Sequence, residues 1–508
     1  MQKKGKLELT WVGKYEEERL EPRILVEDKS KSYGDENTEN ILIHGDNLIA
    51  LKALENDYIG KVKCIYIDPP YNTGNAFEHY EDGIEHSLWL NMIRPRFEIL
   101  WKLLDEKMGS FWVSIDDSEV AYLRVMMDEL FGRDKFVACN VWQKRYSREN
   151  REAIGDVHEY VIVYAKDPKT FKEIRNLTPP DEKQKKVYRN PNKDPRGAWR
   201  PVPMTAQAGH ATKEQFYEII TPSGKIHTPP EGRCWGLSKA TFERMRAEGR
   251  IYFGKKGDAQ PNVIRYLSEV EGFVPWTWWP NEEVGHTDEA KKEIHALFGK
   301  INAFETPKPE RLINRIIHIA TNPGDLVMDS FLGTGTTAAV AHKMGRKYIG
   351  IEMGEHCNAY VLPRMKKVID GEQGGVSKSV NWQGGGGFKF FELAESLLVK
   401  NKVLPIYQLN PQYTFDMVAE AICKIEGFKY DPTGEFHGHS SENRFIHVTL
   451  EFVNSKYIIS LMKSLGDNQS LLIYCTKMQS DMNLPDNVEV KKIPKDLLEK
   501  CTFESEVQ

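Results

Sequence analysis

The 508-residue sequence lacks any run of 18 or more apolar residues, so we expect no membrane-spanning helix and no membrane partner. Its first residues, MQKKGKLELTWVGK, include two early lysines but no apolar segment typical of a secretory signal. Cysteine is scarce: seven residues are scattered along the chain without a CxxC pair, which is typical of reduced thiols in the cytosol. The predicted location is therefore cytoplasmic.

Neither sign of charge dominates, because 69 Lys and Arg residues face 74 Asp and Glu residues, for a net charge of −5. This balance does not exclude a nucleic-acid partner, since local patches matter more than the sum. Apolar residues make up 40% and aromatic residues 11%, which excludes a disordered chain. The length predicts about three domains, and we find no internal repeat.

Buried strands alternate with helices in two parts of the chain, a pattern that indicates parallel βαβ units and an α/β fold. The first part contains a strand, a Gly-Asp turn and a helix in 41–54, a strand in 61–74, a helix in 87–108, and strands in 109–115 and 158–166. The second contains a helix in 307–320, a strand in 325–331, a helix in 336–345 and a strand in 347–353.

Composition divides the chain into five segments. Residues 1–40 are polar and read as an N-terminal arm, and 41–166 and 301–390 are the two α/β halves. Between them, residues 167–300 are interrupted by proline, glycine and aromatic residues; a basic stretch, 143–200, with 15 basic and 9 acidic residues, runs into this segment. Residues 391–508 form a further acidic segment, predicted to be a smaller α/β domain.

A glycine-rich turn, DSFLGTGTT in 329–337, follows a buried strand and opens a helix. Gly333 and Gly335 allow the backbone to turn tightly and to approach a ligand closely. Glu352 ends the next strand, 17 positions beyond Gly335, close to the spacing of about 20 at which an acid binds a ribose. The pattern predicts a nucleoside cofactor; the alternative is a tight turn with a surface acid. No Gly-Lys-Ser/Thr follows, which excludes a P-loop.

A second motif, Asp68-Pro69-Pro70-Tyr71, directly follows the apolar strand CIYI. The two prolines hold their carbonyl groups rigidly and donate no N–H, while Asp68 is an acceptor when ionised and Tyr71 offers an aromatic face. This set suits a planar ring that carries an exocyclic amine. The alternative is a proline-stiffened loop with a core tyrosine, but ligands bind at the carboxyl ends of strands in such sheets.

With these two motifs the chain resembles the DNA adenine-N6 methyltransferases. Its order, in which the DPPY half precedes the cofactor half with a recognition segment between them, resembles the beta group and, within it, the modification (Mod) subunits of type III restriction–modification systems. The matching stretches are LTWVGK, ILIHGDNLIALKAL, IYIDPPYNTG, HEYVIVYAK, FETPKPERLINRII, DSFLGTGTTAAVA, GGGGFKFFEL and parts of 221–294. FLGTG replaces the commoner FAGSG, and 391–508 matches only loosely.

The resemblance implies a doubly wound, Rossmann-like methyltransferase sheet with an inserted target-recognition domain in 167–300 and a partner or dimer domain in 391–508. It implies S-adenosylmethionine as the cofactor. It assigns Phe331, Gly333 and Gly335 to the loop under the methionine part, Asp329 to the charged groups, Thr336 and Thr337 to the helix end facing the carboxylate, Glu352 to the ribose, Lys308 to the carboxylate and Asp46 to the adenine side. For Lys308 alone the alternative is a solvated lysine, and for Asp46 an ordinary helix cap.

The implied chemistry is direct methyl transfer to the N6 amine of an adenine flipped out of double-stranded DNA. Asp68 and the Pro69 carbonyl would accept the amine hydrogens, with Pro70 and Tyr71 completing the catalytic motif and the base stacked on Tyr71. No cysteine follows a proline, which argues against cytosine-C5 methylation, and an aspartate at 68 favours adenine over cytosine N4 by analogy. A solitary DNA methyltransferase, an enzyme acting on RNA or another planar amine, and a module that delivers a partner to DNA stay open.

Analogy further suggests a homodimer and, since no helicase motif is present, a separate restriction (helicase–nuclease) subunit. Trp276, Trp278 and Trp279 are predicted to pack in a core, with a base-stacking platform as the alternative. No metal site is expected, because His437 and His439 have no further ligand cluster in the sequence.

Overall fold

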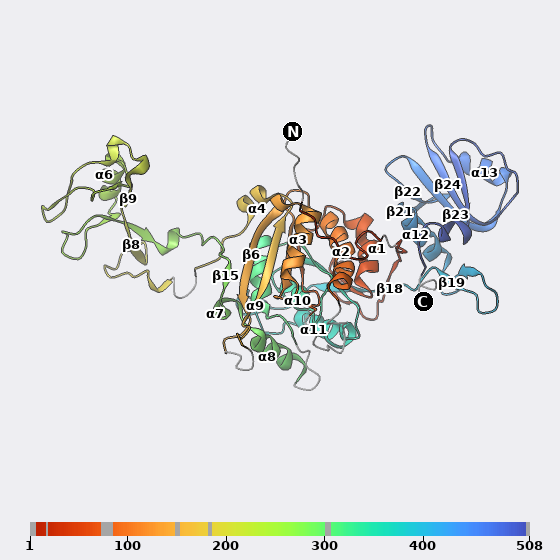
Figure 1. Cartoon of the computed structure of the whole chain (residues 1–508), viewed down its shortest axis with the longest axis horizontal. Helices are drawn as coiled ribbons and strands as arrows, with labels where there is room; N and C mark the ends of the chain where they lie inside the picture. The colour runs from red at the N-terminus through yellow and green to blue at the C-terminus, as the bar shows by residue number, and fades with distance from the viewer. Residues whose placement is uncertain are drawn as a thin grey trace. The chain divides into compact units, whose positions relative to one another are not determined.

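The computed structural model describes residues 7–16, 19–72, 85–147, 153–180, 185–299 and 306–503. The chain folds as two compact units, one made of 1–176 and 276–508 and the other of 177–275 (Figure 1). The second unit is therefore an insertion within the first.

The first unit is built on a mixed sheet, which contains eleven strands among the described residues. Its centre runs in the order β3 (Ile41–His44), β17 (Lys347–Glu352), β16 (Leu326–Asp329), β4 (Cys64–Ile67) and β5 (Ser110–Ile115), all parallel. β7 (His158–Ala165) is antiparallel to β5 and to β6 (Phe136–Gln143), and β15 (Trp278–Trp279) pairs with β6. The predicted α/β class and doubly wound sheet are confirmed.

The central strands are nearly continuous apolar runs because both faces of the sheet are covered. In β4, Cys64 and Tyr66 belong to one hydrophobic core, and Ile65 and Ile67 belong to the other, as the two-residue period of a strand requires. Helices α1 (Asn47–Tyr58), α2 (His86–Leu103) and α3 (Val120–Phe131) share the core that contains Ile65. Helices α9 (Glu310–Ala320), α10 (Thr336–Lys343) and α11 (Leu362–Ile369) share the core that contains Cys64.

The strand order reverses between β16 and β4. Val327 of β16 lies opposite Cys64 of β4, and the chain then leaves β16 toward β17 but leaves β4 toward β5. Since both strands are parallel, the loops after Ile67 and after Asp329 start at the same edge of the sheet. Such a switch point leaves a crevice in which α/β proteins bind ligands.

The described residues of 1–40 include two strands of the main sheet, whereas composition predicted a separate arm. β1 (Leu25–Glu27) and β2 (Tyr33–Gly34) both pair with β18 (Gly387–Leu393), which is parallel to β3. The preceding Ile24 is buried in a core with residues of the C-terminal segment. The N-terminal segment therefore completes one side of the sheet.

The inserted unit is narrower than the predicted 167–300. Its described residues form three small sheets and the helix α6 (Lys239–Ala247). The sheets are β8 (Trp199–Pro203) with β14 (Asn262–Tyr266) and β13 (Ile251–Tyr252); β9 (Thr205–Gln207) with β12 (Arg233–Trp235); and β10 (Ile219–Ile220) with β11 (Ile226–His227). α4 (Pro168–Ile174), α7 (Asn281–Val284) and α8 (Thr287–Phe298) belong to the first unit. Apolar side chains explain why these helices belong to the first unit: Phe171 of α4 and Val284 of α7 are buried in the core that contains Cys64 of β4.

The C-terminal segment carries its own five-stranded sheet within the first unit, in the order β21 (Lys429–Thr433), β22 (Phe436–His439), β23 (Arg444–Val453), β24 (Ser470–Met478) and β25 (Val488–Lys492). α12 (Phe415–Ile425), α13 (Ser455–Met462), α14 (Lys495–Leu498) and the hairpin of β19 (Leu398–Lys400) and β20 (Tyr407–Leu409) accompany it. The C-terminal segment is hydrogen-bonded to the N-terminal segment through the Glu21 carboxylate, which accepts from Ser396 Oγ at 2.6 Å and from Leu397 N at 2.7 Å.

All seven cysteines lie in the described part of the chain and are free thiols. Of the helices built from the described residues, none is both long enough and apolar enough to cross a bilayer.

Candidate active site

The loop after β4 carries the DPPY motif and is fastened from two sides. Trp89 of α2 donates its indole N–H to the Pro70 carbonyl oxygen at 2.8 Å. Asn72, whose φ of 61° is in the left-handed region, donates from Nδ2 to the buried Glu119 carboxylate at 2.6 Å. The prolines and these two hydrogen bonds hold the loop in a single conformation.

Asp68 lies at the centre of a charged cluster. The Lys308 ammonium group lies 2.8 Å from Asp68 Oδ1 and 2.7 Å from Oδ2. The Tyr71 hydroxyl donates to Asp68 Oδ1 at 2.7 Å and also lies 3.0 Å from Glu159 Oε2. Lys308 lies 3.5 Å from the same Glu159 oxygen. The structure thus brings Asp68, Tyr71 and Lys308 together, with Lys308 lying against the DPPY loop. The predicted contact of Lys308 with the cofactor carboxylate stays a prediction.

Glu159 is a site residue that the sequence analysis missed. It lies in β7 within HEYVIVYAK, a stretch that was matched to a family without singling out this residue. A lone acid in a strand otherwise buried and apolar was the available signal, because a buried carboxylate is unfavourable unless it is paired.

Burial raises the pKa of Asp68 above its usual range and the Glu159 carboxylate adds to this, although the Lys308 ammonium opposes it. Burial lowers the pKa of Lys308, but Asp68 and Glu159 together outweigh it and the net direction is upward, so Lys308 is a cation at neutral pH. Burial and the two carboxylates raise the pKa of Tyr71 well above its ordinary value, so its hydroxyl stays a donor.

The glycine-rich loop follows β16 at the neighbouring position of the same edge. Asp329 ends the strand; it accepts from Phe331 N at 2.9 Å and from Thr337 Oγ1 at 2.5 Å. Burial raises the pKa of Asp329 to about 7. This carboxylate therefore changes its charge near neutral pH.

Gly333 and Gly335 have φ of 57° and 81°, which L side chains adopt only with strain. Gly333 N donates to the Glu352 carboxylate at 2.5 Å, so the acid that ends β17 lies against the loop as the spacing suggested. Gly335 caps α10, which begins at Thr336. Thr336 Oγ1 accepts from the buried Arg364 at 2.9 Å.

Asp46 is the cap of α1, accepting from Leu48 N at 2.9 Å and Ile49 N at 3.1 Å. This is the structural role that the sequence left as an alternative. The next residue reaches the glycine-rich loop, because Asn47 donates from Nδ2 to the Ser330 carbonyl at 2.7 Å. Asp46 therefore lies near the loop, and a contact with a cofactor stays a prediction.

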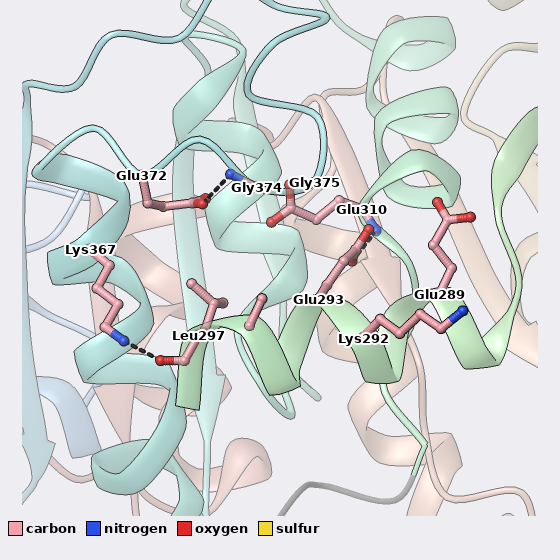
Figure 2. Close-up of a pocket in the computed structure, with 10 residues that line it drawn as sticks. Glu289, Lys292, Glu293, Leu297, Glu310, Lys367, Glu372, Gly374 and Gly375 are labelled. Atoms are coloured by element: carbon pink, nitrogen blue, oxygen red, sulfur yellow. Dashed lines mark hydrogen bonds between the residues drawn. The ribbon is translucent and has the colours of Figure 1, made fainter. Parts of the chain in front are cut away.

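A hollow of about 620 Å³ lies elsewhere in the first unit, between α8, the start of α9, α11 and residues 372–375 (Figure 2). None of its described lining residues is a predicted site residue. Glu310, at its wall, accepts from Lys343 at 2.8 Å and from Arg364 at 2.8 Å. Burial raises the pKa of Glu293, beside it, to about 7. The candidate active site is the edge of the sheet where the loops after β4 and β16 begin, because the candidate acceptors and glycines lie there.

The tryptophan prediction is correct for Trp279, which is buried, and wrong for Trp276 and Trp278, which are about half exposed.

In the described residues, Asp117, Asp156 and His158 come close enough to share a cation. The Lys144 ammonium already lies 2.7 Å from Asp156, and the Tyr160 hydroxyl donates to Asp117 at 2.9 Å. These contacts supply protein partners for both carboxylates.

Comparison with known proteins agrees with this geometry. A family model described as DNA methylase (N6_N4_Mtase) matches residues 62–361, more than half of the chain, from just before β4 to just before α11. The chain belongs to this DNA methylase family, and the resemblance seen in its motifs is confirmed.

Three relatives illustrate the similarity. The StyLTI Mod subunit of a type III restriction–modification enzyme from Salmonella typhimurium is 35% identical, over 59% of this chain and 49% of its own length. A "Probable type III restriction-modification enzyme HindVI Mod subunit" from Haemophilus influenzae is 34% identical, over 70% of this chain and 54% of its own length. The type II methyltransferase M.KpnI from Klebsiella pneumoniae is 30% identical, over 60% of this chain and 77% of its own length. The chain thus spans about half the length of the two Mod subunits.

Proposed function

We propose that the chain transfers a methyl group from S-adenosylmethionine to the N6 amine of an adenine flipped out of double-stranded DNA. One observation carries this proposal: the DPPY loop and the glycine-rich loop follow adjacent parallel strands and meet at one switch point. The loop proposed to accept hydrogen bonds from the adenine amine and the loop proposed to bind the cofactor therefore begin next to each other. Transfer between two bound partners requires such proximity.

The residues present fit the cofactor. Gly333 and Gly335 form a turn with positive φ that opens a helix, and a helix N-terminus favours a carboxylate. Asp329 at the end of β16 and Glu352 at the end of β17 supply buried carboxylates beside this turn, suited to a cationic group and a ribose. S-adenosylmethionine supplies an electrophilic methyl group.

On the side of the target amine, the Asp68 carboxylate and the Pro69 carbonyl can accept hydrogen bonds and carry no donor group of their own. Hydrogen bonds from the adenine amine to these atoms would favour a pyramidal nitrogen whose lone pair is free to attack. The Tyr71 hydroxyl is anchored between two carboxylates, so its ring is held where a flipped base would stack.

A finer assignment follows as part of the proposal: the chain is the modification subunit of a type III-like system in the cytosol, recognises its sequence with 177–275, and works with a second copy and a restriction subunit. Similarity to the StyLTI and HindVI Mod subunits supports it. Similarity to M.KpnI supports the alternative, a DNA methyltransferase of another type.

Methylation sequencing of DNA from a methylation-free host tests the proposal. We expect N6-methyladenine at a discrete motif with the wild type and none with Asp68→Ala. A mark on one strand of an asymmetric motif would support the type III assignment, and a palindrome would contradict it. N4-methylcytosine, or labelled product that only ribonuclease removes, would overturn the adenine-in-DNA assignment.

A further inference from the structure

Glu159 reaches the candidate active site from a strand that belongs to neither motif. β7 is the antiparallel strand between β5 and β6, and Glu159 pairs in register with Trp142 of β6. Its side chain is buried, with 11% exposed, whereas that of Asp68 is 22% exposed. Glu159 thus lies deeper in the site than the acceptor itself.

The two carboxylates share the same donors. Tyr71 donates to Asp68 and lies within hydrogen-bonding distance of Glu159, and the Lys308 ammonium lies near both. A second cation, Lys144, lies 3.5 Å from the other oxygen of Glu159. Glu159 therefore competes with Asp68 for the interaction with the Lys308 cation.

The acceptor capacity of Asp68 makes this sharing important. Each carboxylate oxygen offers about two lone-pair sites. Oδ1 already accepts from Lys308 and Tyr71, and Oδ2 accepts from Lys308. One lone-pair site on Oδ2 is left for a hydrogen of the target amine. The strength of that hydrogen bond depends on how fully Lys308 neutralises the Asp68 carboxylate.

We propose that Glu159 is a positioning residue that shares Lys308 and Tyr71 with Asp68, and so keeps Asp68 a strong acceptor for the target amine. This inference rests on the proposed function and deepens it, because it assigns a role to a residue outside both motifs. Glu159 acts through Lys308 and Tyr71 without touching the reacting atoms.

Several charged or titratable groups face the cluster from the surrounding elements. Those acting on Asp68 or Glu159 are Tyr66 of β4, Asp116 at the end of β5, Lys144 after β6, Asp329 of β16, and Tyr71 and Lys308 from the two loops. Among them, Glu159 raises the pKa of Asp68 and Lys308 lowers it. The Asp68 and Glu352 carboxylates both raise the pKa of Asp329.

The test is the pH profile of kcat for Glu159→Gln at saturating cofactor and DNA. Removing the charge lowers the pKa of Asp68, so the acid limb should move to lower pH by about one pH unit. The plateau of kcat should fall by no more than about tenfold, because one pKa unit corresponds to at most a tenfold change in acceptor strength. KM for DNA should change less than about twofold.

Glu426→Gln is a matched control, because Glu426 is a buried acid that accepts from the Tyr474 hydroxyl at 2.5 Å and Lys491 at 3.0 Å in the C-terminal sheet. It should leave the pH profile unchanged. If Glu159→Gln does not fold, Glu159→Asp keeps the charge one methylene farther away and should move the limb in the same direction by less.

An acid limb that stays in place, or moves to higher pH, in the folded Glu159 variant overturns the inference while wild-type methylation stands. A wild type that methylates no DNA overturns the proposed function instead. A loss of kcat without any shift of the limb would assign Glu159 a structural role only, and also overturns the inference.

Discussion

The Lys308 ammonium group lies within 2.8 Å of both carboxylate oxygens of Asp68, although the two residues are 240 positions apart in the chain. Asp68 begins the loop after β4 and Lys308 precedes α9, so this ion pair joins the two halves of the methyltransferase fold. Lys308 thereby lowers the pKa of the carboxylate that we propose to accept a hydrogen bond from the target amine.

Lys308→Met should move the acid limb of methyl transfer to higher pH, the reverse of the change expected for Glu159→Gln. Lys308 lowers the pKa of Asp68, and loss of such a neighbouring cation is worth about one to two pH units. Steady-state rates across pH measure this. Lys166→Met is the control, because Lys166 is a largely buried lysine paired with Glu106 at 3.1 Å; an equal shift there would contradict the prediction.

Cofactor affinity should rise as the pH increases through about 7 and level off above this value. Asp329 has a pKa raised to about 7, so the fraction of the carboxylate that is ionised, and attracts a cationic cofactor, increases across this range. Calorimetry should give binding roughly tenfold weaker at pH 6 than at pH 8. Asp329→Asn should bind weakly at both values, and a dependence on pH that survives in this variant would exclude Asp329 as its source.

Gly335→Ala should weaken cofactor binding and lower the free energy of unfolding by about 1–2 kcal/mol. The φ of 81° accounts for the strain, because the added methyl group would lie 3.4 Å from Val361, an acceptable contact. Gly324→Ala is the matched control: its φ is 87°, no atom lies within 4 Å, and it precedes the opposite end of β16. Equal losses of affinity in both variants would argue against a special role for the loop.

Glu310→Ala should destabilise the protein strongly. Glu310 is 2% exposed and accepts from Lys343, Arg364 and Val376 N, so its removal leaves two buried cations poorly compensated, at a cost of about 3–5 kcal/mol. Denaturant unfolding measures this. Glu98→Ala, which breaks a surface pair with Arg94 at 2.9 Å, should cost about 1 kcal/mol or less, and a similar loss in both would refute the argument from burial.

The central strands and both motif loops could be predicted because their signals are local. Four apolar residues precede Asp68, and a buried strand precedes the glycine-rich turn. Glu159 could not be found in this way, because its role depends on the antiparallel placement of β7 beside β5 and on Lys308, which follows far along the chain.

The ends of the sheet could not be predicted for a related reason. β1 and β2 have three and two residues, too few for an alternating pattern to be recognised. Their pairing partner β18 lies more than 350 positions later. Composition therefore indicated an arm where long-range pairing makes sheet strands.

The two segments that enter and leave the inserted unit are paired with each other at its base. Thr178 and Phe273 exchange backbone hydrogen bonds of 2.9 Å in each direction, while Asn176 is fastened to the end of α9 through the Ile319 carbonyl at 3.0 Å. The strands of the central sheet contribute nothing to this closure. Exchange of residues 177–275 for another segment would therefore break no hydrogen bond between strands of the central sheet, and under the proposed function it would change DNA recognition while both motif loops stay in place.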